Sequence, residues 1–510
     1  MIVFISIALL FPLVVLLLFK RYNYDEQQRQ RLLAALPSDA RKWPLLGHLP
    51  LFFDNSKPRT AVCFEMFNSL AEQFRNDGLF YLRLGPQDMV HVFSPNAVEA
   101  VLSSSVHIYK SPVYKKMSEW LGSGLIVSSG RRWHRDRKML TPSFHFKILE
   151  QFISTMNEKS NIFCDVIETQ QLKLTDVMDS VSKLALDNIL ETSFGIKSDL
   201  QTKGSNSYSR NFHKFAKLFV SRNFYPLLTN DFIYALTSDG RKSKLAISKL
   251  HKFTMDIVEK RRSEMFRGSS AEVDANNNCS KAKPLLDLML DINLSSSEDM
   301  NLVDIRSQLD SFIFAGHDTV AAALTFALFE LSHRSDIQQK IRDELKDVLS
   351  GQSEITIEHL RNLKYMDMVI RETLRLHAPV PFIARYLKSD LQIGERTIPA
   401  HVELWINIHA LHLDPKIWPD PTTFDPNRFS SENARNRHPF AFTPFSGGLR
   451  NCIGQRYAMN MMKLTLSRVM SRYRIKPVTE RSDIHPALEL TLKTLQPIAI
   501  QLEKDLIITK

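Results

Sequence analysis

The stretch PFSGGLRNCIG at residues 444–454 decides the fold, and within it Cys452 lies among glycines. Gly447, Gly448 and Gly454 let the backbone turn and pass close to a flat ligand, because glycine has no Cβ. The residues behind this loop have a helical pattern, so the positive end of a helix dipole points back at the Cys452 sulfur. Such a setting favours a thiolate.

A lone thiolate favours a particular kind of metal centre. Arg450 supplies a positive charge near Cys452, and Phe445 shields the sulfur from water. Zinc requires about four ligands, whereas haem iron takes a single proximal thiolate that favours O–O cleavage. The full spacing, which includes Gly448 and Gly454, therefore indicates a haem-thiolate centre and not a buried structural cysteine in a glycine turn.

This spacing resembles the haem-binding signature of the cytochrome P-450 superfamily, F-x-x-G-x-R-x-C-x-G, at each defined position. The resemblance implies that Cys452 is the axial ligand of the iron and that Arg450 reaches a haem propionate. Phe445, Gly448 and Gly454 complete the implied cofactor site.

Hydrophobic periodicity predicts a mainly α fold with a minor β region, as the resemblance also implies. We expect a single large domain at 51–510. The predicted helical stretches lie near 145–190, 240–266, 301–333, 335–350, 357–377 and 454–473, and the β-like pieces at 80–85, 89–93, 386–399 and near 489–502.

A second motif, FIFAGHDTV at 312–320, lies inside a helical stretch. A glycine such as Gly316 in a helix interior destabilises the helix by about 1 kcal/mol relative to alanine. One interpretation is a π-type opening that holds water beside Asp318 and Thr319, and the other is close helix packing at Gly316. In the superfamily the pattern A-G-x-D-T lies over the distal face of the haem. The resemblance gives Asp318, Thr319 and Gly316 catalytic roles in delivering protons during oxygen activation.

Three further matches follow the order of the superfamily. Glu372 and Arg375 are one helical turn apart and resemble its E-x-x-R helix, with Arg428 of FDPNRF completing an ion-pair triad that supports the haem pocket. The pair Trp133 and Arg137 has the W-x-x-x-R spacing of a helix that binds propionates.

The turn after the E-x-x-R helix, VPFIAR at 380–385, resembles the segment that lines the substrate pocket. By that resemblance Val380 lines the pocket and Arg385 binds the other propionate. A solvated surface charge is the alternative for each of these basic residues.

The N-terminus carries an uncharged apolar run from Ile2 to Phe19, long enough to cross a hydrocarbon core of about 30 Å with some thinning. We expect a membrane anchor at 1–20 and a basic, proline-rich linker at 21–50; a cleaved signal peptide is the alternative. The basic residues after the run keep the rest of the chain cytoplasmic, so we expect a single-pass protein of the endoplasmic reticulum membrane.

Composition and net charge indicate the class of the protein and the kind of partner that it binds. The 510 residues have 44% apolar content, which excludes a disordered chain, and four cysteines without zinc spacing, which exclude a disulfide scaffold. No dinucleotide fingerprint is present. The resemblance therefore implies electrons from NADPH through a cytochrome P-450 reductase, with cytochrome b5 as a further candidate donor. We expect no nucleic-acid partner. The net charge of +11 suits an acidic partner, and basic residues near the propionate helix are candidates for docking it: Arg131, Arg132, Arg135 and Lys138.

The resemblance implies a monooxygenase that inserts one atom of O2 into a lipophilic substrate. WHRDRKMLTPSFHF at 133–146 is most similar to the fourth family, whose members include fatty-acid ω-hydroxylases. That branch often carries a glutamate that esterifies the haem, where this chain has Ala315. We therefore expect non-covalent haem b, with Ala315 in the substrate pocket.

Other interpretations stay open at this point. They are a steroid- or xenobiotic-oxidising monooxygenase, a haem-thiolate isomerase or dehydratase, and a non-catalytic haem- or lipid-binding protein. The apolar stretch at 223–236 is interpreted either as a second membrane contact or as a partly buried turn between helices.

Overall fold

The computed structural model describes residues 25–203, 207–268, 283–295 and 300–506. The predicted anchor at 1–20 lies outside them. The described chain is mostly helical with minor strands, which confirms the predicted fold class.

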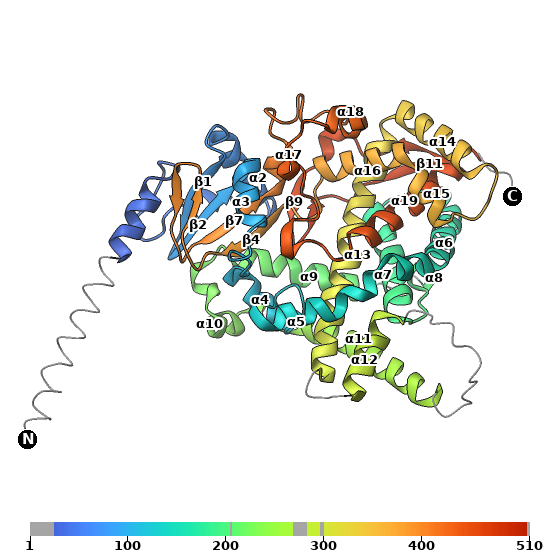
Figure 1. Ribbon diagram of the computed structural model, residues 1–510, viewed down its shortest axis with the longest axis horizontal. Helices are drawn as coiled ribbons and strands as arrows, with labels where there is room; N and C mark the ends of the chain where they lie inside the picture. The colour runs from blue at the N-terminus through green and yellow to red at the C-terminus, as the bar shows by residue number, and fades with distance from the viewer. Residues whose placement is uncertain (1–24, 204–206, 269–282, 296–299, 507–510) are drawn as a thin grey trace, which may run out of the picture.

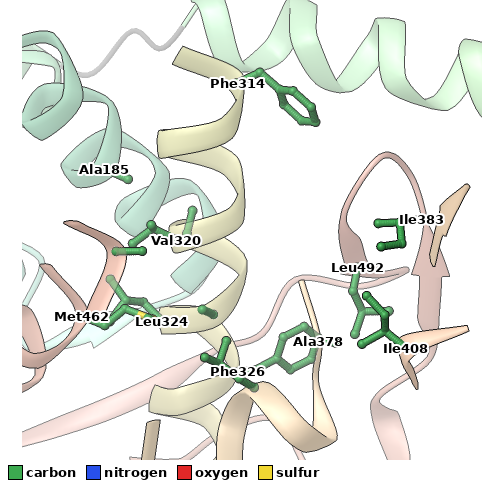
Figure 2. Close-up of a cluster of buried hydrophobic side chains, with 14 of the residues drawn as sticks. Ala185, Phe314, Val320, Leu324, Phe326, Ala378, Ile383, Ile408, Met462 and Leu492 are labelled. Carbon is green, nitrogen blue, oxygen red and sulfur yellow. The ribbon is translucent and has the colours of Figure 1, made fainter. Parts of the chain in front are cut away.

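The helices surround the long central helix α13 (Leu302–Ser332), which crosses the middle of Figure 1. It packs against α7, α16 and α19. Figure 2 shows Ala185 of α7, Val320 and Leu324 of α13 and Met462 of α19 lying together on one side of α13. The remaining helices are α2 (Arg59–Gln73), α3 (Pro95–Leu102), α4 (Pro112–Leu121), α5 (Gly130–Leu140), α6 (Phe146–Thr169), α7 (Val177–Phe194), α8 (Leu200–Lys203), α9 (Ser207–Arg222), α10 (Asp231–Leu236), α11 (Ser238–Gly268), α12 (Leu285–Ser295), α14 (Ser335–Leu349), α15 (Ile357–Asn362), α16 (Lys364–Leu376), α17 (Ile408–His412), α18 (Ser431–Ala434) and α19 (Gln455–Arg472).

A four-stranded sheet lies at the left of Figure 1 in the order β1-β2-β7-β4. The pairs β1–β2 and β7–β4 are antiparallel, and β2–β7 is parallel. The strands are β1 (Leu79–Leu84), β2 (Gln87–Val92), β3 (Lys173–Leu174), β4 (Phe382–Tyr386), β5 (Leu391–Ile393), β6 (Arg396–Ile398), β7 (Glu403–Asn407), β8 (Tyr473–Pro477), β9 (Pro486–Leu488), β10 (Leu492–Thr494) and β11 (Ile500–Lys504).

Helix α13 is the one helix of the described ranges that is long and apolar enough to cross a membrane. However, 83% of its most apolar window is buried inside the protein. It is therefore a core helix, and its apolar character reflects contacts on all sides.

Residues that the sequence assigned to the linker pack on the sheet. Leu33 and Leu36 are buried, and the guanidinium of Arg29 lies 2.8 Å from the Asp88 carboxylate at the start of β2. A bridge joins Ser38 to Tyr81 of β1. These contacts extend the folded body back to at least Leu33.

Two of the predicted helices are divided. The stretch 145–190 forms α6 and α7, because the chain turns through β3 and Asp176 then caps α7 by accepting from the Asp179 amide. The stretch 357–377 forms α15 and α16. Strands β4 and β7 were not predicted, since short buried strands have little alternation to show.

Candidate functional site

The Cys452 loop is held by backbone contacts. The Cys452 amide donates to the Phe445 carbonyl at 2.9 Å. Gly448 has a φ of 62°, and a Cβ there would overlap the carbonyl oxygen of Leu102. Helix α19 begins directly after Gly454, as predicted. The loop therefore requires glycine at 448 and presents the cysteine from a fixed backbone.

Cys452 lines a cavity of about 430 Å³. The side chain of Phe445 lines it beside the cysteine, and α13 contributes Ala315, Gly316 and Thr319. Most of the lining is apolar, and α4, α9, β4 and the segment after β9 contribute to it beside α13. The predicted pocket residues Ala315 and Val380 both line this cavity, as do Leu125, Ile126, Phe144, Ile189, Phe219, Phe382, Ile383, Leu488 and Leu490.

The charge beside the sulfur differs from the expectation. Burial raises the pKa of Cys452, while the Gly454 amide and the Arg137 guanidinium oppose that rise. Arg137 donates to the carbonyl and the side chain of Asn451 at 2.9 and 2.8 Å, so it lies against the cysteine loop. Arg450 was predicted to supply this charge, but it donates elsewhere.

Arg450 belongs to a cluster of cations in which Arg385 is buried and Lys110 and Arg450 are partly buried. Burial and its cationic neighbour Arg385 lower the pKa of Arg450 to about 9, and the pKa of Lys110 is lowered by burial and by both arginines. Arg385 is 2% exposed, and the one hydrogen bond of its side chain among the described residues runs from Nη1 to the Ala384 carbonyl at 3.2 Å. Within the described ranges no carboxylate pairs with any of the three.

The donors of Arg450 are only partly satisfied. Its Nε donates to the Ile108 carbonyl at 3.1 Å and its Nη2 to the Ser128 carbonyl at 2.9 Å, whereas Nη1 has no hydrogen-bond partner among the residues that the structure describes. The guanidinium stacks over the Trp133 ring at 4.0 Å. Trp133 thus reaches the cluster through Arg450.

These residues fit a haem. Buried cations without counter-charges are costly, and a ligand with two carboxylates, such as the two haem propionates, would neutralise Lys110, Arg385 and Arg450. In the same cavity Cys452 offers a thiolate for the iron. Sequence reasoning missed Lys110, because an isolated lysine in a loop carries no pattern.

The motif on α13 agrees with the second of its two interpretations, close helix packing at Gly316. The helix is continuous through Gly316, without the π-type opening. A Cβ at Gly316 would lie 2.8 Å from Cδ1 of Ile189, so glycine here permits close approach of α7. The Thr319 hydroxyl donates to the Ala315 carbonyl at 2.6 Å and lines the cavity.

Asp318 points away from the cavity lining. It is 1% exposed and accepts from Lys493 Nζ and Thr491 Oγ1, each at 2.5 Å. Burial alone would raise its pKa, but the Lys493 ammonium holds the pKa of Asp318 at about 2. The acid is therefore ionised and anchored by the segment after β9, and sequence reasoning named neither partner.

The Glu372–Arg375 pair is fully buried, with Nε–Oε2 and Nη2–Oε1 distances of 2.7 and 2.8 Å. Arg375 also donates to the carbonyls of His412 and Pro421. Arg428 Nε lies 3.4 Å from Glu372 Oε1 and completes the triad. The triad ties α16 to the segment that leads to the cysteine loop.

Two basic residues on the face of α5 form ion pairs within the protein. Arg132 pairs with Asp304, and Arg135 with Asp136 at 2.9 Å. Arg131 and Lys138 are exposed.

Comparisons with known proteins agree with this site. The family model "Cytochrome P450" matches residues 37–502. Cytochrome P450 4V2 of Rattus norvegicus is 36% identical over 479 residues, covering 92% of this chain and 90% of that protein. Its namesake in Homo sapiens is 35% identical over 498 residues, covering 96% and 94%. Cytochrome P450 4A24 of Sus scrofa is 33% identical over 510 residues, covering 98% and 97%. The crystal structure of the cytochrome P450DA heme domain has the same fold, with a TM-score of 0.76 at 23% identity, covering 92% of this chain and 98% of that one.

Proposed function

The chain belongs to the cytochrome P-450 family and is a haem-dependent monooxygenase; from this premise we propose that it hydroxylates fatty acids or related lipids. Bound haem with a proximal thiolate activates O2 for insertion into a C–H bond. The observation that carries the substrate class is the apolar cavity of about 430 Å³ beside Cys452. The named relatives of the fourth family support the same class.

The cavity residues bind and orient the substrate. Phe144, Phe219 and Ile383 are among the apolar side chains that exclude water from the space beside Cys452. An alkyl chain gains about 0.8 kcal/mol for each CH2 that it buries. Affinity should therefore rise with chain length until the cavity is filled.

Thr319 relays protons in this proposal, and Asp318 is a positioning residue on the same turn of α13. The Thr319 hydroxyl lies on the cavity wall, and the ionised Asp318 precedes it on α13. The Thr319 hydroxyl can pass a proton into the cavity, whereas the ionised carboxylate of Asp318 faces Lys493 and Thr491 and fixes the turn of α13 that carries Thr319. Thr319→Ala should therefore raise the hydrogen peroxide released per NADPH consumed; unchanged coupling would remove this role.

The haem is non-covalent in this proposal, because Ala315 offers no carboxylate where an ester would form. Acid–butanone extraction should then remove all haem from the protein. Haem that stays with the chain after extraction would contradict it.

The protein acts at the cytoplasmic face of the endoplasmic reticulum membrane in this proposal. The segment after α9 supports it, because Leu227, Phe232 and Leu236 are 73%, 74% and 64% exposed. Large exposed apolar side chains on neighbouring turns indicate a contact with lipid. Deletion of residues 1–20 should weaken membrane association without abolishing it, whereas full solubility would exclude the second contact.

Electrons come from NADPH through a flavoprotein reductase, with cytochrome b5 as an additional donor. Arg131 and Lys138, exposed on α5, are suited to an acidic partner. Reduction by the reductase should slow with rising salt, and it should slow in Arg131→Gln at low salt.

A turnover screen tests the substrate class directly. Purified protein, reductase and NADPH are incubated with a lipid extract, and mass spectrometry follows products that gain one oxygen atom. Hydroxylated fatty acids are the expected result. Hydroxylated steroids or drugs without lipid products would contradict the substrate class. Products from lipid hydroperoxides that form equally well without NADPH would indicate an isomerase or dehydratase.

A further inference from the structure

The cavity contains a second kind of polar site, at Lys116 on α4. Lys116 lines the cavity and is partly buried, and its Nζ donates to the Asn223 Oδ1 atom at 3.0 Å. Asn223 lies just after α9 and lines the same cavity. In the part of the chain that the structure describes, no ion pair joins Lys116 to a carboxylate.

The acidic groups nearest to Lys116 have other partners. Arg222 binds Glu119 and Asp231, and Glu403 accepts from the Ser111 hydroxyl. Burial and then Arg222 lower the pKa of Lys116, and the smaller opposing effects of Glu403, Asp231 and Glu119 do not reverse this shift, so the positive charge is only partly compensated. A charge in this position gains from an anion brought into the cavity.

This site is distinct from the cation cluster that fits the haem. Lys110 faces the Tyr114 ring at 4.2 Å and is repelled by Arg385 and Arg450. The charges that act on Lys116 are those of Arg222 at the end of α9, Asp231 on α10, Glu403 on β7 and Glu119 on α4 itself, and neither Arg385 nor Arg450 is among them. The two cationic sites therefore occupy different parts of the cavity wall.

The position of Asn223 connects the site with the exposed apolar surface. The residues that follow it include Leu227 and Phe232, which are among the most exposed large apolar side chains of the protein. A lipid that enters from that surface would bring its polar end to Lys116 and Asn223 and extend its alkyl chain along the apolar wall.

We propose that Lys116, with the amide of Asn223, binds the carboxylate of a fatty-acid substrate. This inference rests on the proposed function and adds the anionic headgroup to it. Asn223 Nδ2 donates one N–H to the Phe219 carbonyl at 2.8 Å, so the Lys116 ammonium and the second N–H of Nδ2 would together donate to the two carboxylate oxygens. A fixed carboxylate sets which carbon reaches the Cys452 end of the cavity, so Lys116 determines the position of hydroxylation as well as affinity.

A purely structural role is the competing explanation. The Lys116–Asn223 hydrogen bond and the Arg222–Glu119 ion pair both join α4 to the end of α9. Lys116→Gln separates the two roles, because glutamine still donates to Asn223 but carries no charge. Lys116→Arg keeps the charge. Lys115→Gln is the matched control, since Lys115 is the adjacent, exposed lysine of the same helix.

The test uses haem-loaded, full-length protein and a series of saturated fatty acids with their methyl esters. Equilibrium titration should show about a tenfold rise in Kd for the acids in Lys116→Gln, while the esters change less than about twofold. Lys116→Arg and Lys115→Gln should bind the acids within about threefold of the wild type. Lys116→Gln should also spread hydroxylation over more positions of the chain, which a structural tie retained by glutamine would not cause.

Two outcomes overturn the inference in distinguishable ways. If the wild type binds acids and esters equally well and Lys116→Gln does not change this, the proposed carboxylate site is refuted, and the proposal of lipid hydroxylation is unaffected. Failure of the wild type to bind or hydroxylate either series removes the proposed substrate class itself.

Discussion

Arg385→Met should change the haem-free and haem-loaded proteins in opposite directions. Arg385 is 2% exposed, and its side chain makes a single hydrogen bond within the described ranges and lies beside the cations Lys110 and Arg450. In the haem-free protein the substitution loses about 1 kcal/mol of hydrogen bonding but removes an uncompensated buried charge worth several kcal/mol. We expect the haem-free variant to be about 1–3 kcal/mol more stable.

The haem-loaded protein loses a charge-assisted hydrogen bond of about 1.5–3 kcal/mol to a propionate. Haem affinity should then fall about ten- to a hundredfold. Urea unfolding of both forms and haem transfer to apomyoglobin measure the two effects. Arg131→Met on the exposed face of α5 is the control and should change neither by more than about 0.5 kcal/mol. A haem-free Arg385→Met protein that is less stable, with unchanged haem affinity, would refute the assignment of this cluster to the propionates.

Glu372→Gln leaves Arg375 buried without its counter-charge, so thermal unfolding should show a loss of about 3–5 kcal/mol; a loss below about 1 kcal/mol would mean that the triad is not structural. Gly448→Ala should cut the yield of haem-loaded protein, because a Cβ at φ 62° meets backbone, whereas Gly351→Ala, at φ 82° in open space, should cost only about 1–2 kcal/mol of backbone strain; equal effects would contradict the role of close packing at 448. Burial raises the pKa of Asp310 to about 8, so the folded state keeps a proton that the unfolded state releases, and stability should fall as pH rises from about 4 to about 8. Asp310→Asn should remove this slope in urea unfolding, and a parallel pH profile for variant and wild type would disprove it.

Short-range patterns accounted for much of the site. Residues Phe445 to Gly454 lie in one loop, so their spacing in the sequence was enough to predict how they are arranged. The Glu372–Arg375 pair lies on one helical turn and formed as expected, with Arg428 at ion-pair distance.

Contacts between distant segments could not be predicted from the sequence. Lys110 meets Arg385 across a β-bridge, and Lys493 meets Asp318 from the segment after β9. No periodicity links such positions. The same limit explains why the sequence assigned the positive charge beside the sulfur to Arg450. Arg137 supplies this charge instead, because α5 packs on the cysteine loop.

The glycine of α13 shows how one residue type supports two interpretations. In the sequence alone, Gly316 is compatible with a helix opening and with a close helix contact. The position of Ile189 on α7 shows that Gly316 permits a close contact between the two helices. Only the arrangement of the two helices contains that information.

The spectrum of the reduced carbon monoxide complex tests most directly whether Cys452 holds the haem iron as a thiolate. Purified, haem-loaded wild-type protein should show the long-wavelength Soret band of thiolate coordination, and Cys452→Ala should lose it. A histidine-type band in the wild type, or a long-wavelength band that persists in Cys452→Ala, would contradict the assignment.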